Sequence, residues 1–389
     1  MNINFKINIV PDFEDIRFYN DSEVQQALRD NLNHPMITAL LHFTFPKISE
    51  EEIAEKVLSC RSIQDFQESI IKYTVENVLE RSSEGLSYSG FEALKKDEAY
   101  FYISTHRDII LDTSLLNYVL LQKELCMTAS AIGDNLVRRS FLMALAKLNR
   151  NFLVKRGLGP REMLQSSTVL SQYIRSLILE DKRSVWMAQR EGRTKDGDDK
   201  TQQGVLKMVG MAKGSESLLE FFGRLKIVPV AISYEFDPTD ILKMPELLAK
   251  RMEQNYVKSA NEDFNSIIKG AMGQKGRIHI QAGKVIEPAE LRNLEQEVSS
   301  VNGQLKALAG LIDQRIYENY KLWPSNFIAY DLLQEDALFE DRYTSKEKRQ
   351  FERRVLKRVN VQNTLELNSY LLMYANPVIN QYKLYENQG

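Results

Sequence analysis

Apolar residues recur at helical spacing through most of the first quarter of the chain. Val24, Leu28 and Leu32 lie four residues apart, and a second series runs through residues 63–75. Side chains on one face of a helix recur every three or four positions, so this pattern predicts helices that each bury one side. We expect an N-terminal helical module over residues 1–95.

The pattern then changes to short aromatic and β-branched runs separated by helical patterns. The first run, 100–103, precedes polar residues and an apolar helical pattern at 115–120. Strands that alternate with helices predict an α/β domain with a mostly parallel sheet, which we place at residues 96–300. The other predicted strands are 152–154, 184–188, 227–232 and 277–280, and the predicted helices between them are 161–179 and 205–222.

Residues 301–389 are helical in pattern, and we expect this C-terminal region to pack on the α/β domain. The predicted fold class is therefore α/β. A mostly parallel sheet is flanked by helices, with a helical module before it and a helical region after it.

Composition narrows the classes of protein that fit. The net charge of -2 argues against a protein built to neutralise nucleic-acid phosphates. Cys60 and Cys126 are too few for a disulfide framework or a Cys-rich zinc site. Residues 1–6 lack the basic and apolar pattern of a secretory signal, and no apolar run is long enough to span a membrane. We expect an intracellular protein without a transmembrane helix.

Candidate chemistry lies in the loops after predicted strands, where an α/β sheet presents its ligand site. His106 follows the first strand and could accept a proton from a hydroxyl, with Asp112 or Asp108 fixing its tautomer. Two further loops, 155–157 and 189–196, combine glycine with cations that suit a phosphate. Together they predict a base beside a cationic pocket.

Two other interpretations fail on motif completeness. The triplet 106–108 spells His-Arg-Asp, as in protein kinases, but a kinase needs Asn where Thr113 stands, and its glycine-rich loop is missing. A calcium loop that begins at Asp196 needs Glu at its twelfth position, which Lys207 occupies. We expect no dedicated metal site.

Four ordered blocks carry a family resemblance. They are His106 with a downstream aspartate, then 152–156, then 191–193, then 227–231. In this order and spacing they resemble the glycerolipid acyltransferase superfamily, which includes glycerol-3-phosphate and 1-acylglycerol-3-phosphate acyltransferases. The resemblance covers residues 100–233.

The resemblance implies roles for these residues. His106 would be the general base. The family places its aspartate five positions after the histidine, where this chain has Leu111, so the partner is either Asp112, which we favour, or Asp108. We expect the Asp112 carboxylate within roughly 2.6 to 3.2 Å of the imidazole. The residues implied in substrate binding are Arg107, Lys155, Arg156, Glu191, Gly192, Arg193 and Lys195.

The implied reaction moves a fatty acyl group from acyl-CoA or acyl carrier protein onto a hydroxyl of a glycerophosphate or lysophospholipid-type acceptor. It needs no metal and no cofactor. The alternative is a non-catalytic lipid- or acyl-carrier-binding protein on a degenerate acyltransferase scaffold, which the shifted aspartate would explain.

Two segments are candidates for lipid contact. Residues 345–360 form a basic amphipathic pattern, with Phe351, Val355 and Val359 among many cations. This helix either lies on anionic headgroups or packs through its apolar stripe. The apolar segment 36–41 contacts an acyl chain or bilayer, or belongs to the core. We expect a cytoplasmic protein associated peripherally with the inner face of the membrane.

Overall fold

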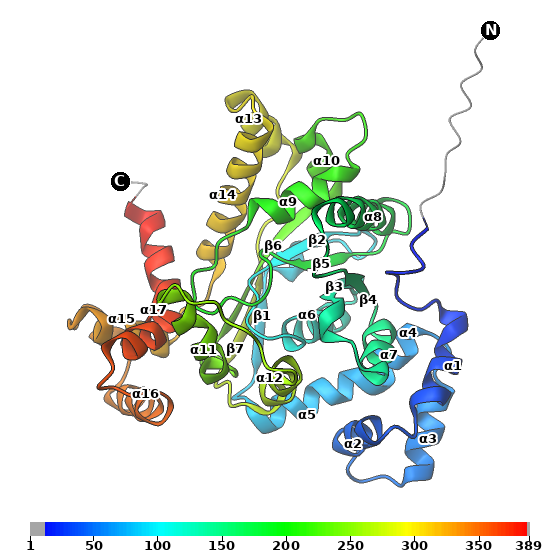
Figure 1. Cartoon of the computed structure of the whole chain (residues 1–389), viewed down its shortest axis with the longest axis horizontal. Helices are drawn as coiled ribbons and strands as arrows, with labels where there is room; N and C mark the ends of the chain where they lie inside the picture. The colour runs from blue at the N-terminus through cyan, green and yellow to red at the C-terminus, as the bar shows by residue number, and fades with distance from the viewer. Residues whose placement is uncertain (1–11, 387–389) are drawn as a thin grey trace.

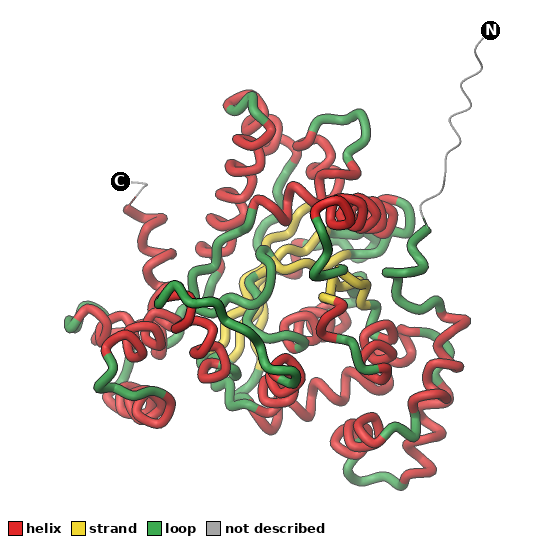
Figure 2. The backbone as a smooth tube through the Cα atoms, in the orientation of Figure 1, coloured by secondary structure: helices red, strands yellow, loops and turns green. Residues whose placement is uncertain are grey.

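The computed structural model describes residues 12–386, which form a seven-stranded sheet with helices on both faces (Figures 1 and 2). Residues 1–6, where no secretory signal was expected, lie outside the described residues. The predicted α/β class is confirmed. The strands are β1 (Leu86–Ser89), β2 (Phe101–Ser104), β3 (Ala129–Gly133), β4 (Asn151–Val154), β5 (Val185–Ala188), β6 (Ile227–Tyr234) and β7 (Ile278–Ala282).

The strand order is β1-β7-β6-β2-β5-β3-β4. Five strands, from β6 to β4 in this order, are mutually parallel. β7 pairs antiparallel with β6, and β1 pairs parallel with β7. The sheet is therefore mostly parallel, as predicted, and β2 lies at its centre.

One face of the sheet packs on helices from the middle of the chain. Phe101, Ile103 and Met187 point to this face because alternate residues of a strand point to opposite sides. They share a core cluster with the covering helices, which Figure 1 shows above the sheet. These helices are α8 (Pro160–Leu179), α9 (Gln203–Val209), α10 (Leu218–Leu225), α13 (Pro288–Glu297) and α14 (Val301–Asn319).

The other face packs on α5 (Lys72–Ser82) and α6 (Leu111–Gln122), with Tyr102 and Trp186 in the shared cluster. The N-terminal helices form a cluster with Phe141 of α7 (Ser140–Leu148). The helices predicted in this region are confirmed. They are α1 (Asp21–Asn31), α2 (Pro35–Thr44), α3 (Glu50–Ser59), α4 (Ile63–Phe66) and the π-helical turn η1 (Gln67–Ile71), which leads into α5.

The C-terminal region is helical, as expected, and a buried carboxylate joins it to the sheet domain. Asp240 accepts hydrogen bonds from Arg354 Nε (2.9 Å), the Tyr370 hydroxyl (2.7 Å) and the Tyr374 hydroxyl (2.9 Å). Apolar residues of the same helices form one cluster. The helices are α11 (Asp240–Arg251), α15 (Pro324–Gln334), α16 (Ser345–Arg358) and α17 (Thr364–Glu386).

Some elements differ from the sequence prediction. β1 and β3 were not predicted, and β1 lies within residues 1–95, so the sheet takes an edge strand from the segment assigned to the helical module. The predicted helix 205–222 is divided into α9 and α10, because Gly214 adopts a left-handed conformation (φ 65°) between them. The division of the chain at residues 95 and 300 remains a prediction.

Candidate active site

The carboxyl end of β2 lies between the ends of β5 and β6. Past Ser104, Thr105 continues the pairing with β6. Its backbone N–H donates to Val230 O (3.3 Å), and its hydroxyl accepts the Ile232 N–H (3.0 Å). His106 follows and leaves the sheet. The candidate base thus lies at the edge where parallel sheets present their ligand sites.

A buried carboxylate orients His106. His106 Nδ1 lies 2.8 Å from Oδ2 of Asp112, which is fully buried in the first turn of α6. The same oxygen accepts the backbone N–H groups of Arg107 (2.6 Å) and Asp108 (3.0 Å), and Oδ1 accepts the Tyr234 hydroxyl (2.8 Å). The predicted contact is confirmed. A carboxylate here accepts the Nδ1–H, which leaves Nε2 of the neutral imidazole as a proton acceptor.

Two aromatic residues enclose this pair. Burial, together with the neighbouring charge of Asp112, raises the pKa of Tyr234 well above its usual value, so its hydroxyl remains a donor. The ring of Trp186 meets the His106 ring edge-on, with centres 5.5 Å apart, and its Nε1–H donates to Ser104 Oγ (2.9 Å). The His106 side chain is 14% exposed, so a substrate can reach the imidazole while Asp112 stays out of water.

Asp108, the alternative partner, bonds to the helix instead. Its Oδ1 accepts the backbone N–H groups of Ile110 (3.0 Å) and Leu111 (2.9 Å). Its Oδ2 is buried without a hydrogen-bond partner in the described part of the chain. Burial, and then the charge of Asp112, raise the pKa of Asp108. Asp112 therefore contacts the imidazole, while Asp108 satisfies free amides at the start of α6.

Arg193 is buried without a carboxylate partner. Its exposed fraction is 8%, and within residues 12–386 its hydrogen bond runs from Nη1 to Thr239 Oγ1 (3.3 Å). The next residue, Thr194, donates its backbone N–H to His106 O (2.8 Å), which holds this segment beside the imidazole. A buried guanidinium that no carboxylate neutralises favours an anionic ligand, because an uncompensated buried charge is costly.

Arg107 has a different environment. Its guanidinium is buried, pairs with Asp199 (2.5 Å) and lies 5.8 Å from the ring centre of Tyr320. Asp199 also accepts the Thr194 hydroxyl (2.9 Å). The geometry of Arg107 therefore suits positioning of the 191–199 loop. The sequence had implied a different role for Arg107, direct contact with a substrate.

The other predicted cations are partly exposed, and each meets a carboxylate. Exposed ion pairs contribute little to stability, so such a cation can exchange its partner for an anionic substrate at small cost. In the turn before Arg193, Gly192 has a φ of 70°, which glycine adopts without strain. The pairs are Lys155 with Asp15 (3.1 Å), Arg156 with Glu191, and Lys195 with Glu246 (2.7 Å).

Several residues of the site were missed in the sequence. Tyr234, Trp186 and Thr239 contact the predicted residues but lie far from His106 in the chain, and no local pattern marks them. Gln189, directly after β5, is buried with neither of its side-chain polar atoms bonded in the described chain. Gln189 belongs to the candidate site because buried polar groups without partners often contact a ligand. The only signal for it in the sequence was its position directly after a predicted strand.

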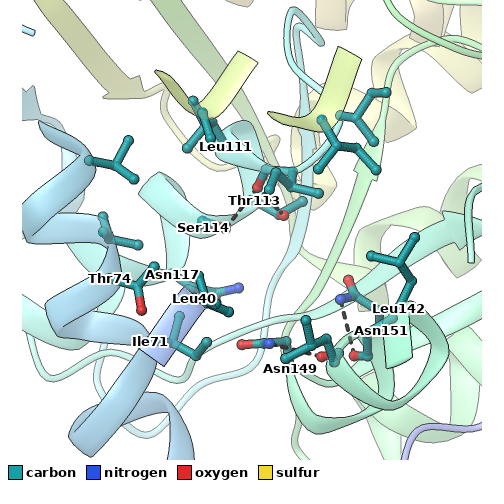
Figure 3. A pocket seen from close by; sticks show the side chains of 18 of the residues that line it. Leu40, Ile71, Thr74, Leu111, Thr113, Ser114, Asn117, Leu142, Asn149 and Asn151 are labelled. Carbon is teal, nitrogen blue, oxygen red and sulfur yellow. Dashed lines mark hydrogen bonds between the residues drawn. The ribbon is translucent and has the colours of Figure 1, made fainter. Parts of the chain in front are cut away.

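An apolar cavity of about 380 Å³ lies beside the first turns of α6 (Figure 3). Ile110 and Leu111, a few residues after His106, line one part of it. Its volume is within the range of small-molecule sites. Ala39, Ile268 and Met272 also line it and are exposed, so it opens between α2 and α12. The walls come from α2, η1, α5, α6, β3, the 3-10 turn η3 (Asp134–Leu136), α7, β4 and α12 (Glu262–Met272).

The apolar segment 36–41 divides between core and cavity. Met36, Ala39 and Leu40 line the cavity, whereas Ile37 and Leu41 are buried in the core of the N-terminal helices. This division follows from helical geometry, because residues three or four positions apart share one face.

Among residues 12–386, no cluster of three or more His, Cys, Asp or Glu side chains is placed to hold a metal ion. In the acidic segment after Lys195, Asp198 pairs with Lys200 (2.7 Å). Gly197 packs so closely on α17 that an added Cβ would lie 2.2 Å from Met373 O. Within the same residues, no helix has the length and apolar character to cross a membrane.

Residues 85–233 match the family model described as Acyltransferase, so this part of the chain is similar to acyltransferase domains. The family resemblance seen in the four blocks is confirmed. No curated protein matches the chain. Among solved structures, the chain is similar to the 1-acyl-sn-glycerophosphate (LPA) acyltransferase PlsC from Thermotoga maritima. The two are 14% identical with a TM-score of 0.37, over 77% of this chain and 94% of that chain.

Close packing behind the loop gives a stability test. A Cβ at Gly270 of α12 would lie 2.0 Å from Asp108 Oδ2. We expect Gly270→Ala to displace α12 or the loop and to lower the free energy of unfolding by about 1–3 kcal/mol. In α14, a Cβ at Gly310 meets nothing within 4 Å, so Gly310→Ala should raise the free energy of unfolding by up to about 1 kcal/mol. Denaturant unfolding measures both, and effects of the same sign would contradict the packing argument.

Proposed function

We propose that this chain transfers a fatty acyl group from acyl-CoA or acyl carrier protein to a hydroxyl of a glycerophosphate or lysophospholipid-type acceptor in membrane lipid synthesis. The observation that supports this most is the His106–Asp112 pair at the end of the central strand, inside the matched segment. A histidine held by a buried carboxylate is suited to general-base catalysis.

In the proposed mechanism, His106 Nε2 removes the proton of the acceptor hydroxyl as its oxygen attacks the thioester carbonyl. A new C–O bond forms and the C–S bond breaks. The imidazolium then returns the proton to the leaving thiolate. Asp112 stabilises the imidazolium and keeps Nε2 directed at the substrate, and a backbone N–H stabilises the oxyanion. The transfer is direct, so no acyl-enzyme intermediate and no metal are needed.

Arg193 is the proposed contact for the acceptor phosphate. Its burial without a carboxylate and the hydrogen bond between Thr194 and His106 favour an anion next to the base. Lys155, Arg156 and Lys195 would add attraction from the rim of the site. Arg107 would act through Asp199 by positioning the loop.

The cavity beside α6 is the proposed site of the acyl chain. Its wall is mainly apolar, and two of the lining residues, Ile110 and Leu111, follow His106 closely in the sequence. Transfer of an alkyl chain from water into such a space is favourable by about 0.8 kcal/mol per methylene. A long-chain donor would therefore gain binding energy there and present its thioester to His106.

Because both substrate classes are amphiphilic, we propose that the protein acts peripherally at the inner face of the cytoplasmic membrane. The mouth of the cavity supports this, since Ile268 and Met272 are 43% and 46% exposed there. Exposed apolar side chains around a cavity mouth favour a lipid surface over water.

Substitution of His106 tests the base. We expect His106→Ala to lower the rate of thiol release from acyl-CoA with a phosphorylated acceptor by about 10²–10⁴-fold. Asp112→Asn should cause a loss of similar order, because the imidazolium loses its counter-charge. His42→Ala is the control, since His42 is exposed and its ion-pair partner among the described residues is the exposed Glu50 (3.5 Å). Equal rates for wild type and His106→Ala would remove His106 from the mechanism. No transfer by wild type with any acceptor would favour a lipid- or acyl-carrier-binding protein.

Arg193→Gln tests the acceptor contact. Loss of a charge-assisted hydrogen bond to phosphate should raise the acceptor KM by about 10–100-fold and leave the donor KM nearly unchanged. Arg156→Gln is the control, because its guanidinium is partly exposed and paired with Glu191; we expect a change below about threefold. If both variants shift the acceptor KM equally, Arg193 has no special role.

Closing the cavity mouth tests the acyl site. Ala39 is exposed at the mouth, so Ala39→Trp should hinder long-chain donors at least about tenfold, which corresponds to 1.4 kcal/mol, and spare acetyl and butyryl donors. Ala289→Trp, at an exposed site on α13, should change neither. Transfer rates are measured for donors of increasing acyl-chain length. If Ala39→Trp leaves the dependence of rate on chain length unchanged, the acyl chain binds elsewhere.

A further inference from the structure

Helix α16 presents a row of exposed cations. Lys346, Arg349, Arg353 and Lys357 recur every three or four residues and are all exposed. Within residues 12–386, none of them lies within ion-pair distance of a carboxylate. With the exposed Leu356 (64%), they form what we call the basic face.

The opposite side of α16 is fixed to the protein. Phe351 and Val355 are buried in the C-terminal cluster, and Arg354 and Arg358 pair with Asp240 (2.7 and 3.3 Å). The expectation that this helix packs through its apolar stripe is therefore confirmed, and the other face alone is left for lipid contact. The apolar stripe packs inward, and the inner cations are neutralised, while the outer cations are left without counter-charges.

The composition of the basic face indicates the kind of partner. The whole chain has a net charge of -2, so the cations concentrated here are a local feature. Leu356 lies among them, and Leu338, just before α16, is 58% exposed. Cations interleaved with exposed leucine are typical of helices that lie on anionic lipid, where the cations meet headgroups and the leucines enter the boundary.

The inner side of α16 is connected to the proposed acceptor site. Arg354 Nη2 donates to Asp237 O (3.2 Å), and Asp237 Oδ1 accepts the backbone N–H of Thr239 (2.9 Å). Thr239 Oγ1 in turn accepts from Arg193 (3.3 Å). In Figure 1, α16, α12 and α2 all lie in the lower half of the molecule, and the cavity opens between α2 and α12.

We propose that the basic face docks on an anionic phospholipid surface and holds the cavity mouth and the acceptor site against the bilayer. This inference rests on the proposed acyl transfer to a lipid-type acceptor. It adds the surface by which the enzyme meets that lipid. The attraction is electrostatic, so it weakens as salt shortens the range of the interaction.

The test is sedimentation of the full chain with vesicles that contain phosphatidylglycerol and phosphatidylcholine, compared with phosphatidylcholine alone. One variant replaces Lys346, Arg349, Arg353 and Lys357 by Gln. Each cation near an anionic surface contributes about fivefold, so binding should fall by two orders of magnitude or more. A matched control replaces four exposed cations on and beside α9, α13 and α14, and should bind as wild type. These are Lys207, Lys284, Arg292 and Lys306.

Acyl transfer with a short-chain donor and glycerol-3-phosphate, both dissolved in water, separates docking from catalysis. The α16 variant should retain this activity and lose activity only toward acceptors held in anionic vesicles. With a short-chain 1-acylglycerol-3-phosphate as a second water-soluble acceptor, wild-type transfer to both acceptors would fail if the proposed function were wrong, whatever the vesicle result.

Three results would overturn the docking proposal. They are absence of wild-type binding to anionic vesicles, unchanged binding by the α16 variant, and an equal loss for both variants. A further outcome has a distinct meaning. If the α16 variant binds vesicles normally but loses transfer from acyl carrier protein and not from acyl-CoA, the basic face docks an acidic carrier protein and not lipid.

Discussion

The buried carboxylate of Asp112 is the interaction on which the site depends. It accepts hydrogen bonds from the His106 ring, the backbone of Arg107 and Asp108, and the Tyr234 hydroxyl. These donors come from the loop after β2 and from the end of β6, while the acceptor belongs to α6. Because a buried charge without partners costs several kcal/mol, the network strongly favours one loop conformation. The six-residue step from His106 to Asp112 is accommodated because α6 begins only at Leu111.

Local signals decided which parts of the fold were predictable. β2, β5 and β6 are buried strands whose apolar runs contrast with their neighbours, and the helix predicted at 161–179 matches α8 closely. β3 (Ala129–Gly133) is rich in small residues and β1 has serine at every second position, so neither contains an apolar run that stands out. Both form because adjacent strands supply hydrogen bonds, which a single segment does not encode.

The candidate site, too, was predictable only in part from the sequence. The resemblance identified His106 and the loops around it, but the spacing left Asp108 and Asp112 as competing partners. Their difference depends on where α6 begins and on Tyr234, which comes from another strand. Arg107 and Arg193 look equivalent in the sequence, yet Arg107 is buried against Asp199, while Arg193 pairs with no carboxylate in the part of the chain that the structure describes. Burial and pairing are properties of the assembled fold.

The cavity mouth and the candidate base come from different parts of the chain. The base and the loops around it lie within residues 85–233, but α2 and α12, which form the mouth, lie outside this segment. Among the described residues, the hydrogen-bond donors to the Asp112 carboxylate lie in neither of those two helices. The shape of the cavity mouth can therefore change through residues of the described helices α2 and α12 that form no hydrogen bond with the carboxylate holding His106.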